Sequence, residues 1–419
     1  MGRRDPRTSG AGPAESAIAT ILWPGSFLWY AMAACTLFLH TVSVLAPWLI
    51  AEFGFSRVQL GAISTVTFSC AAITSLLTGH LVDRHGTRRA MWGLFALNGG
   101  AFVTLGLSPA GPWVFLGAVL GGVGTALGNP ATNQVISTSV ERARRGLLVG
   151  IKQAGVPSSA FLAGAVLPPV AIAFGWRTAV FVAFVFTVMG AAITVRLPRP
   201  GSTGATSDEP TRDLGEAARP ILMLTIYVFL VGSGISAVQT YIVLFGVEEL
   251  GLLETAAGWG AALVGMLGIV SRVFAAPIAQ RFARPSIPLL LVAAGALISS
   301  LLLLLAPVYP ALFFVGAAGV GLTALAGNSV AHLMIVTELP QGIAGKASGA
   351  VQTGFYAGFI LFPLVFGWIV DRTEAYWQGW LLVAAWFLAA CVVPLLSWHQ
   401  GRGSPTGDVN RPQTGPGGS

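Results

Sequence analysis

The segments GLLVGIKQAG (residues 146–155) and GKASGAVQTG (residues 345–354) share one spacing of three glycines and a glutamine. The repeated residues are Gly146, Gly150, Gln153 and Gly155 in the first segment and Gly345, Gly349, Gln352 and Gly354 in the second. The same offset of 199 residues aligns Gly128-Asn129 with Gly327-Asn328 and His40-Thr41 with Gln239-Thr240. One match could arise by chance, but the set indicates two halves built on the same plan.

The composition places both halves in a membrane. Of the 419 residues, 54% are hydrophobic and only 9% are charged, and the mean hydropathy is +0.76, whereas a soluble chain needs a more charged surface. A helix of about 20 apolar residues crosses a hydrocarbon core of about 30 Å. Twelve apolar runs are predicted to be transmembrane helices: 22–50, 57–80, 89–108, 112–139, 147–173, 176–196, 220–246, 256–280, 286–306, 309–337, 345–370 and 377–398.

The predicted fold is therefore an all-α integral membrane protein with two pseudo-symmetric bundles of six helices. The segment at 197–219 is rich in Pro, Gly, Ser and charge, which is typical of a flexible linker. It separates the helices six and six. The predicted organisation is an N-terminal tail at 1–21, a first bundle at 22–196, the linker, a second bundle at 220–398 and a disordered tail at 399–419.

The positive charges predict which end of the bundle faces the cytoplasm. With the N-terminus inside the cell, only Arg57, Arg177 and Arg372 of the 23 Lys and Arg residues lie outside, and Arg272 alone lies deep in the membrane. This asymmetry follows the positive-inside rule and predicts cytoplasmic termini for a multi-pass protein of the cell membrane. The net charge of +7 thus reflects topology, and we expect no nucleic acid partner.

The segment GHLVDRHGTRRAMWGL (residues 79–94) resembles the cytoplasmic signature loop of the major facilitator superfamily. The matching residues are Gly79, Leu81, Asp83, Arg84, Gly86 and Arg88. Gly79 is expected to let helices approach closely, and Gly86 to permit a tight turn. The resemblance implies that Asp83 latches the outward-facing state. The alternative for Arg84 and Arg88 is that they only set topology.

The resemblance also implies a substrate site at mid-membrane between the halves. The predicted substrate-binding polar residues are Asn129, Asn133, Asn328, His332, His40, Gln239, Tyr241, Gln352 and Tyr356, in addition to Arg272. Asn129 with Asn133, and Asn328 with His332, are spaced i, i+4 and so share one helical face. Each of these residues could instead bond a neighbouring helix. Lys152, beside Gln153, could snorkel to the cytoplasmic surface or supply a second cation.

Arg272 is the most unusual residue of the sequence. It lies about four residues, or ~6 Å, past the centre of the run at 256–280, where a charge is costly. The 16 acidic residues all fall in loops, helix ends or tails, so no carboxylate is expected at its depth. A guanidinium binds a carboxylate in a fork, which favours an anionic substrate. This position also resembles the monocarboxylate and oxalate transporter branches. The alternative is a structural brace between helices.

These features predict a secondary transporter that moves a small organic anion, monocarboxylate-like, by alternating access. The runner-up is an exporter of amphipathic, drug-like compounds, and a non-transporting membrane sensor is a poorer alternative. No metal cluster, nucleotide loop or nucleophile–base set is visible in the sequence, so we expect neither an enzyme nor a cofactor or metal. We expect a monomer whose partners are the lipid bilayer and its small-molecule substrate.

Overall fold

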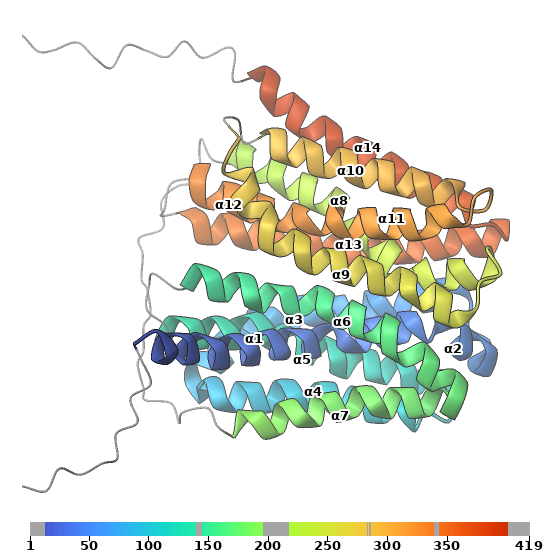
Figure 1. Cartoon of the computed structure of the whole chain (residues 1–419), viewed down its shortest axis with the longest axis horizontal. Coiled ribbons are helices and arrows are strands. Elements are labelled where there is room, and N and C mark those ends of the chain that lie inside the picture. The colour runs from blue at the N-terminus through green and yellow to red at the C-terminus, as the bar shows by residue number, and fades with distance from the viewer. Residues whose placement is uncertain are drawn as a thin grey trace, which may run out of the picture.

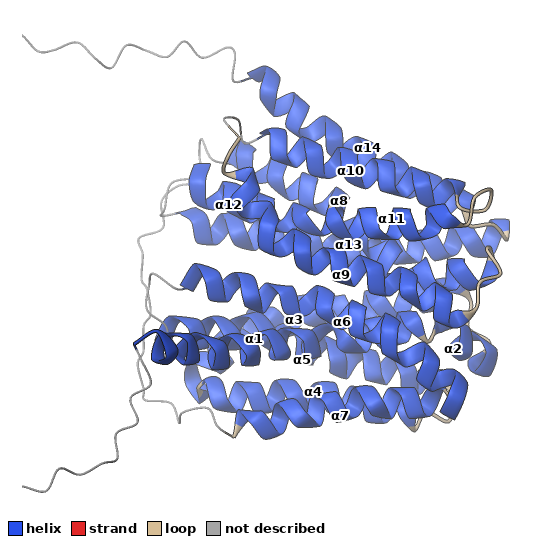
Figure 2. Ribbon diagram, in the orientation of Figure 1, coloured by secondary structure: helices blue, strands red, loops and turns tan. Residues whose placement is uncertain are grey.

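A computed structural model describes residues 13–139, 145–195, 218–282, 284, 286–338 and 343–400. Within these ranges the chain is helical and contains no strand (Figure 2). Nearly all of the predicted linker at 197–219 lies outside the described residues, as do the start of the N-terminal tail and the C-terminal tail beyond Gln400.

The helices of the first half follow the predicted apolar runs closely. They are α1 (Pro13–Val44), α2 (Ala46–Phe53), α3 (Arg57–His85), α4 (Thr87–Gly106), α5 (Gly111–Ser139), α6 (Arg145–Phe174) and α7 (Trp176–Thr194). The predicted run at 22–50 is divided near Leu45, and α2 ends at Gly54, whose φ of 64° suits glycine. Ser56 and Gln59 then form a capping box that starts α3.

The second half repeats this order with one interruption. Its helices are α8 (Ala218–Glu248), α9 (Glu254–Ala279), α10 (Ser286–Leu305), α11 (Ala311–Leu322), the 3₁₀ turn η2 (Ala324–Ala326), α12 (Gly327–Glu338), α13 (Ala344–Thr373) and α14 (Trp377–Gln400). The predicted span at 309–337 corresponds to one apolar stretch, Ala311–Ile335, but the α-helix within it is interrupted. Thr323 has φ −107° and ψ −68°, and Ala326 N donates to Thr323 O in a 3₁₀ step.

Eleven helical stretches of the described residues are long and apolar enough to cross a membrane. One of them, Ala311–Ile335, includes α11, η2 and most of α12. The predicted run at 89–108 forms α4, which packs between α5 and α7 but is not among the eleven. Its first turn carries Arg88 and Arg89, which lower its hydropathy. The chain is a multi-pass membrane protein, and the predicted count of twelve is not confirmed.

The two halves lie side by side along the bundle. In Figure 1, α1–α7 (blue to green) group on one side and α8–α14 (yellow-green to red) on the other. The start of α1 and the end of α14 lie at the same end, which we call the terminal end; the opposite end, where α2 lies, is the far end. The principal contacts between the halves join α6 to α9 and α3 to α13.

Glycines allow α6 and α9 to touch through their backbones. A Cβ atom on Gly164 would collide with the Gly258 carbonyl, and one on Gly265 would collide with the backbone of Phe161. Such close approach between small residues is how helices associate in lipid. It also carries α9 toward the first half, and Arg272 lies on this helix.

Candidate functional site

Arg272 is the centre of a polar cluster between the two halves. Its side chain is buried, with a relative exposure of 9%, although it is a permanently charged group. Nη1 donates to Oε1 of Gln153 on α6 over 3.3 Å, and the buried Nε has no hydrogen-bond partner in the part of the chain that the structure describes. No carboxylate of the described residues forms an ion pair with it. Within these residues one of the five N–H donors of the guanidinium is therefore engaged, and by a neutral group.

Lys152, the neighbour of Gln153, is a second buried cation. Its side chain is 1% exposed, and Nζ donates to Oδ1 of Asn133 on α5 over 2.5 Å. The expectation that Lys152 snorkels to the surface is contradicted by this burial. The residue lies two turns inside α6, and Asn133 supplies an oxygen within reach, so the ammonium stays in the bundle. The sequence alternative, a second cation, fits this position.

The second half contributes polar groups from α12 and α13. His332 lies close enough to Arg272 for their charges to interact, and the Gln352 amide is within hydrogen-bonding reach of His332 and Tyr356. Asn328, one turn before His332, has a buried Oδ1 atom without a partner. The structure thus brings the predicted residues His332 and Gln352 near Arg272, while Lys152 and its partner Asn133 lie beside Gln153 on α6. We call Asn133, Lys152, Gln153, Arg272, His332 and Gln352 the central cluster.

Three of the predicted substrate-binding residues have surroundings other than the central cluster. His40 is buried, and its Nδ1 lies 3.0 Å from both the Thr36 carbonyl and the Ser159 hydroxyl, while Nε2 has no partner. Gln239 is buried, and its backbone carbonyl accepts from Ser43. Asn129 is half-buried. Among the described residues, no hydrogen bond links these three side chains to the central cluster.

Tyr241 lies elsewhere, contrary to the prediction that it contacts substrate. Its side chain is fully buried and stacks on Phe366 with 4.6 Å between ring centroids. The hydroxyl lies 2.7 Å from the carbonyl oxygens of both Arg57 and Pro363 and donates into that pair. In the sequence Tyr241 lies about eight residues past the centre of the predicted run at 220–246, toward its outer end. The actual position joins α8 to the start of α3 at the far end.

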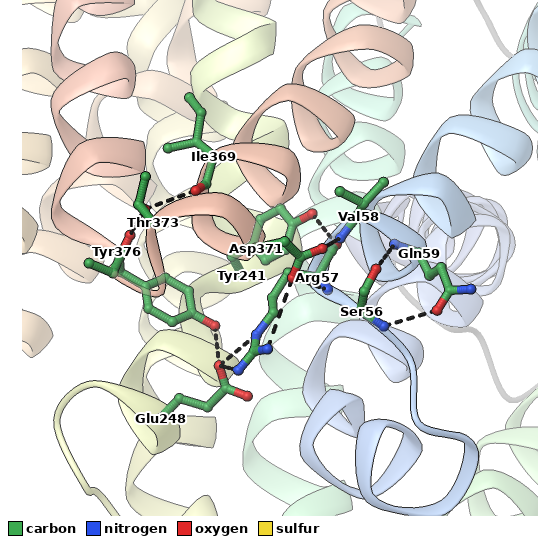
Figure 3. A network of polar contacts seen from close by, with 11 residues as sticks. Ser56, Arg57, Val58, Gln59, Tyr241, Glu248, Ile369, Asp371, Thr373 and Tyr376 are labelled. Carbon is green, nitrogen blue, oxygen red and sulfur yellow. Dashed lines mark hydrogen bonds and ion pairs between the residues drawn. The ribbon is translucent and has the colours of Figure 1, made fainter.

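This far end is closed by a charged network that the sequence analysis missed (Figure 3). The Asp371 carboxylate of α13 accepts from the backbone N–H groups of Arg57 and Val58, each over 2.9 Å. Arg57 Nη2 pairs with Glu248 of α8 at 3.0 Å, and the Tyr376 hydroxyl donates to the same Glu248 oxygen over 2.6 Å. We call Arg57, Glu248, Asp371 and Tyr376 the far-end latch.

A signal for this latch was present in the sequence. Arg57 begins one predicted run, whereas Glu248 and Asp371 end runs of the other half, and all three were expected on the same side of the membrane. Asp371 caps the exposed N–H groups at the α3 N-terminus, where a negative charge is favoured by the helix dipole. Proximity to Glu248 also raises the pKa of the Tyr376 phenol above its usual value, after the larger effect of burial.

The gating motif lies at the terminal end, between α3 and α4. Gly86 has a φ of 79°, which confirms the tight turn expected there. Gly79 does not mediate close packing in this conformation, because a Cβ atom on it would meet nothing within 4 Å. Arg84 is exposed and Arg88 half-buried. The Asp83 side chain lies outside the described residues, so its role as a latch stays a prediction.

The contacts between the halves are unevenly distributed along the bundle. The hydrogen bonds and ion pairs that join them in the described residues involve Ser43, Arg57, Val58, Thr65, Tyr241 and Arg272. The one nearest the terminal end is the bond of Arg272 to Gln153; the others lie toward the far end. Asn133 is exposed, and His332 and Gln352 are half-buried, so the central cluster is not fully enclosed.

Comparison with known proteins gives consistent matches over the whole bundle. A family profile described as "Major Facilitator Superfamily" matches residues 26–363 and 250–416. A probable sulfoacetate transporter of Cupriavidus necator is 25% identical over 374 residues, which are 80% of this chain and 84% of that protein. A class E tetracycline resistance protein of Escherichia coli is 23% identical over 400 residues, covering 88% of this chain and 95% of that protein.

Solved structures share the same fold. A bacterial homologue of the human lysosomal transporter Spinster, in an inward-facing and occupied conformation, superimposes with a TM-score of 0.73 at 15% identity. The match covers 93% of this chain and 98% of that one.

Proposed function

This chain belongs to the major facilitator superfamily and is a membrane transporter, and we propose that it carries a small organic anion by alternating access. The observation that carries this proposal is Arg272, a buried guanidinium at the interface of the halves with one neutral partner. A buried charge without a counter-ion is costly, so the site favours a ligand that supplies the negative charge. The forked geometry of the guanidinium suits a carboxylate or sulfonate.

We propose that the two halves, 22–196 and 220–398, rock as units about the central cluster. The far-end latch and the glycine contacts of α6 with α9 hold the far end together in this conformation. With the terminal end in the cytoplasm, as the charge distribution predicts, this is an inward-facing state of a cell-membrane transporter. The linker at 197–219 then joins the halves on the cytoplasmic side.

A second candidate, an exporter of amphipathic compounds, is favoured by aromatic rings beside the cluster. Phe68 of α3 lies 5.8 Å from Tyr356 and 4.5 Å from Phe359 of α13, measured between ring centroids. Flat apolar molecules pack well on such rings. Similarity to a tetracycline resistance protein supports this candidate, whereas similarity to a probable sulfoacetate transporter supports the anion.

The experiment is transport by the purified protein in liposomes, after a thermal-stabilisation screen of carboxylates, sulfonates and neutral amphiphiles. Arg272→Lys keeps the charge but loses the fork, and Arg272→Gln loses both. Since one charge-assisted hydrogen bond contributes about 1.5–3 kcal/mol, we expect anion uptake to fall about 10-fold or more in the first variant and further in the second. Arg281→Gln, which removes an exposed arginine just beyond α9, is the matched control.

Uptake of the anion by Arg272→Gln at the wild-type rate would overturn the proposal. Transport of neutral amphiphiles by wild type, with no stabilisation by any anion, would establish the exporter in its place.

A further inference from the structure

The central cluster contains two buried cations and no resident carboxylate among the described residues. We infer that Lys152 and Asn133 form a second anion subsite, and that the substrate is a dianion whose two acidic groups bind Arg272 and Lys152. This inference rests on the proposed function and adds the charge class of the substrate. Each buried cation requires a counter-charge, so a ligand of charge −2 leaves neither uncompensated.

The ammonium of Lys152 has unused binding capacity. It carries three donors, and in the described part of the chain its hydrogen-bond partner is the single Asn133 oxygen. The ionisable groups described on the helices packed against α6 are few: Cys35, His40 and Tyr30 on α1, Glu254 and Arg272 on α9, and Arg177 on α7, with none on the described part of α5. The first turn of α1 also contains Glu15, whose side chain lies outside the described residues. Of the described groups, the neutral thiol of Cys35 lies in electrostatic range of Lys152. None of them supplies a negative charge to the ammonium.

The sequence repeat places the two cations at one depth. The offset of 199 residues relates Asn133 to His332 and Gln153 to Gln352, and parallel repeats are related by an axis along the membrane normal. Lys152 interacts with Asn133, and Arg272 interacts with Gln153 and His332, so both cations lie at the level of these repeat-related residues.

The separation of the two cations is bounded by the chain that links them. Arg272 Nη1 is 3.3 Å from the Gln153 side chain, and Gln153 adjoins Lys152 in α6. The extended side chains of Lys152 and Gln153, the Cα–Cα step between these two residues and the hydrogen bond to Arg272 add up to at most about 18 Å between the two charges. The linear dicarboxylates from malonate to suberate have carboxyl carbons about 2.5–9 Å apart and, with a hydrogen bond at each end, bridge cations about 10–16 Å apart, which is within this bound. One end of the dianion would lie on each half of the transporter.

Asn133 provides the entrance to this subsite. Its side chain is exposed although Lys152 behind it is sealed, so the amide lies between the ammonium and solvent. A change of rotamer removes the amide oxygen from Nζ and leaves room for an acidic group of the substrate. Without a bound substrate, the neutral Asn133 amide oxygen accepts the hydrogen bond that Lys152 would otherwise donate to this acidic group.

The test compares linear dicarboxylates, from malonate to suberate, with their half-amides, which have nearly the same shape and one charge less. Affinity for the full-length protein is measured by calorimetry at pH 7.5. For at least one chain length, wild type should bind the dianion about 10- to 100-fold more tightly than the half-amide, the contribution of one charge-assisted hydrogen bond. In Lys152→Met this ratio should fall to about 1, while Lys346→Met, which removes an exposed lysine of α13, should keep it.

Asn133→Asp is the second variant. It places a carboxylate beside Nζ, at an exposed position that tolerates substitution, and should also abolish the preference for dianions if Lys152→Met fails to fold. Equal affinities of wild type for every pair, or an unchanged ratio in Lys152→Met or Asn133→Asp, would overturn the second subsite alone. Failure of wild type to bind any dicarboxylate would overturn the dianion inference, whereas full binding of anions by Arg272→Gln would overturn the anion proposal itself.

Discussion

The far-end latch makes a quantitative prediction about the conformational equilibrium. In Asp371→Asn the side chain keeps its shape and one acceptor oxygen. It loses the charge that faces the α3 N-terminus and one of the two 2.9 Å bonds to the Arg57 and Val58 N–H groups. The lost hydrogen bond to a charged acceptor contributes about 1.5–3 kcal/mol, and the lost interaction with the helix dipole about 0.3–1 kcal/mol.

These two free energies stabilise only the state in which the far end is closed, because the contact joins α13 of one half to α3 of the other. The Asp371 side chain is 21% exposed, so solvent screens it only in part, and we take about 2–3 kcal/mol as the bias. The equilibrium between closed and open far ends should therefore shift about 30- to 150-fold toward the open state. If the ratio of closed to open molecules in wild type is smaller than this factor, the open state is the more populated one in Asp371→Asn.

The assay measures distances by pulsed electron spin resonance between labels at Ala110→Cys and Tyr309→Cys, in a background without the three native cysteines. These exposed positions are related by the repeat and lie in the far-end turns before α5 and α11. Asp371→Asn should add a longer distance to the distribution. Glu374→Gln removes another carboxylate just after α13 and should not do so. Identical distributions for Asp371→Asn and wild type, with anion transport also unchanged, would refute the reasoning.

Two further predictions concern the interface of α6 with α9 and the surface of the far end. Gly164→Val should open the far end in the same distance assay, because its Cβ would collide with the Gly258 carbonyl, whereas Gly150→Ala, with nothing within 4 Å, should have no effect. Hydrogen bonds from the Arg177 guanidinium and the Trp176 indole hold the pKa of Glu52 below its usual value. The stabilisation by this contact is therefore present at neutral pH and is lost as the pH falls through the lowered pKa, so Glu52→Gln should make the melting temperature less sensitive to pH between about 6 and 3.

The positions of the helices could be predicted well from the sequence because the membrane restricts the choices. Every backbone polar group in lipid must be bonded within a helix, so long apolar runs such as 112–139 and 147–173 map directly onto α5 and α6. The division of the run at 309–337 was not predictable in the same way. The break at Thr323 is a change of backbone dihedral angles followed by a 3₁₀ turn, and it leaves the hydropathy of the run unchanged.

The site was predicted less completely because depth in the membrane does not determine direction. Arg272 was identified since a charge at that depth has few explanations, and in the structure it bonds Gln153 of the other half. Tyr241 lies about eight residues past the centre of its run at 220–246, and its hydroxyl is directed to backbone carbonyls of the far end. The latch pairs Arg57 with residues about 190 and 310 positions away, and only the packing of α3 on α8 and α13 brings them together.

The partner of the Arg272 guanidinium is the neutral amide of Gln153, which affects how easily the two halves separate. The bond to Gln153 joins the two halves, so it must break or reform whenever they separate at the terminal end. A carboxylate in place of Gln153 would form a buried ion pair, and removing one partner of such a pair costs about 3–5 kcal/mol, enough to hold the halves in one state. A neutral amide separates more easily and leaves the charge of the guanidinium for the substrate. With the anionic substrate proposed above, its binding, and not a resident ion pair, would determine when the central contact between the halves is strong.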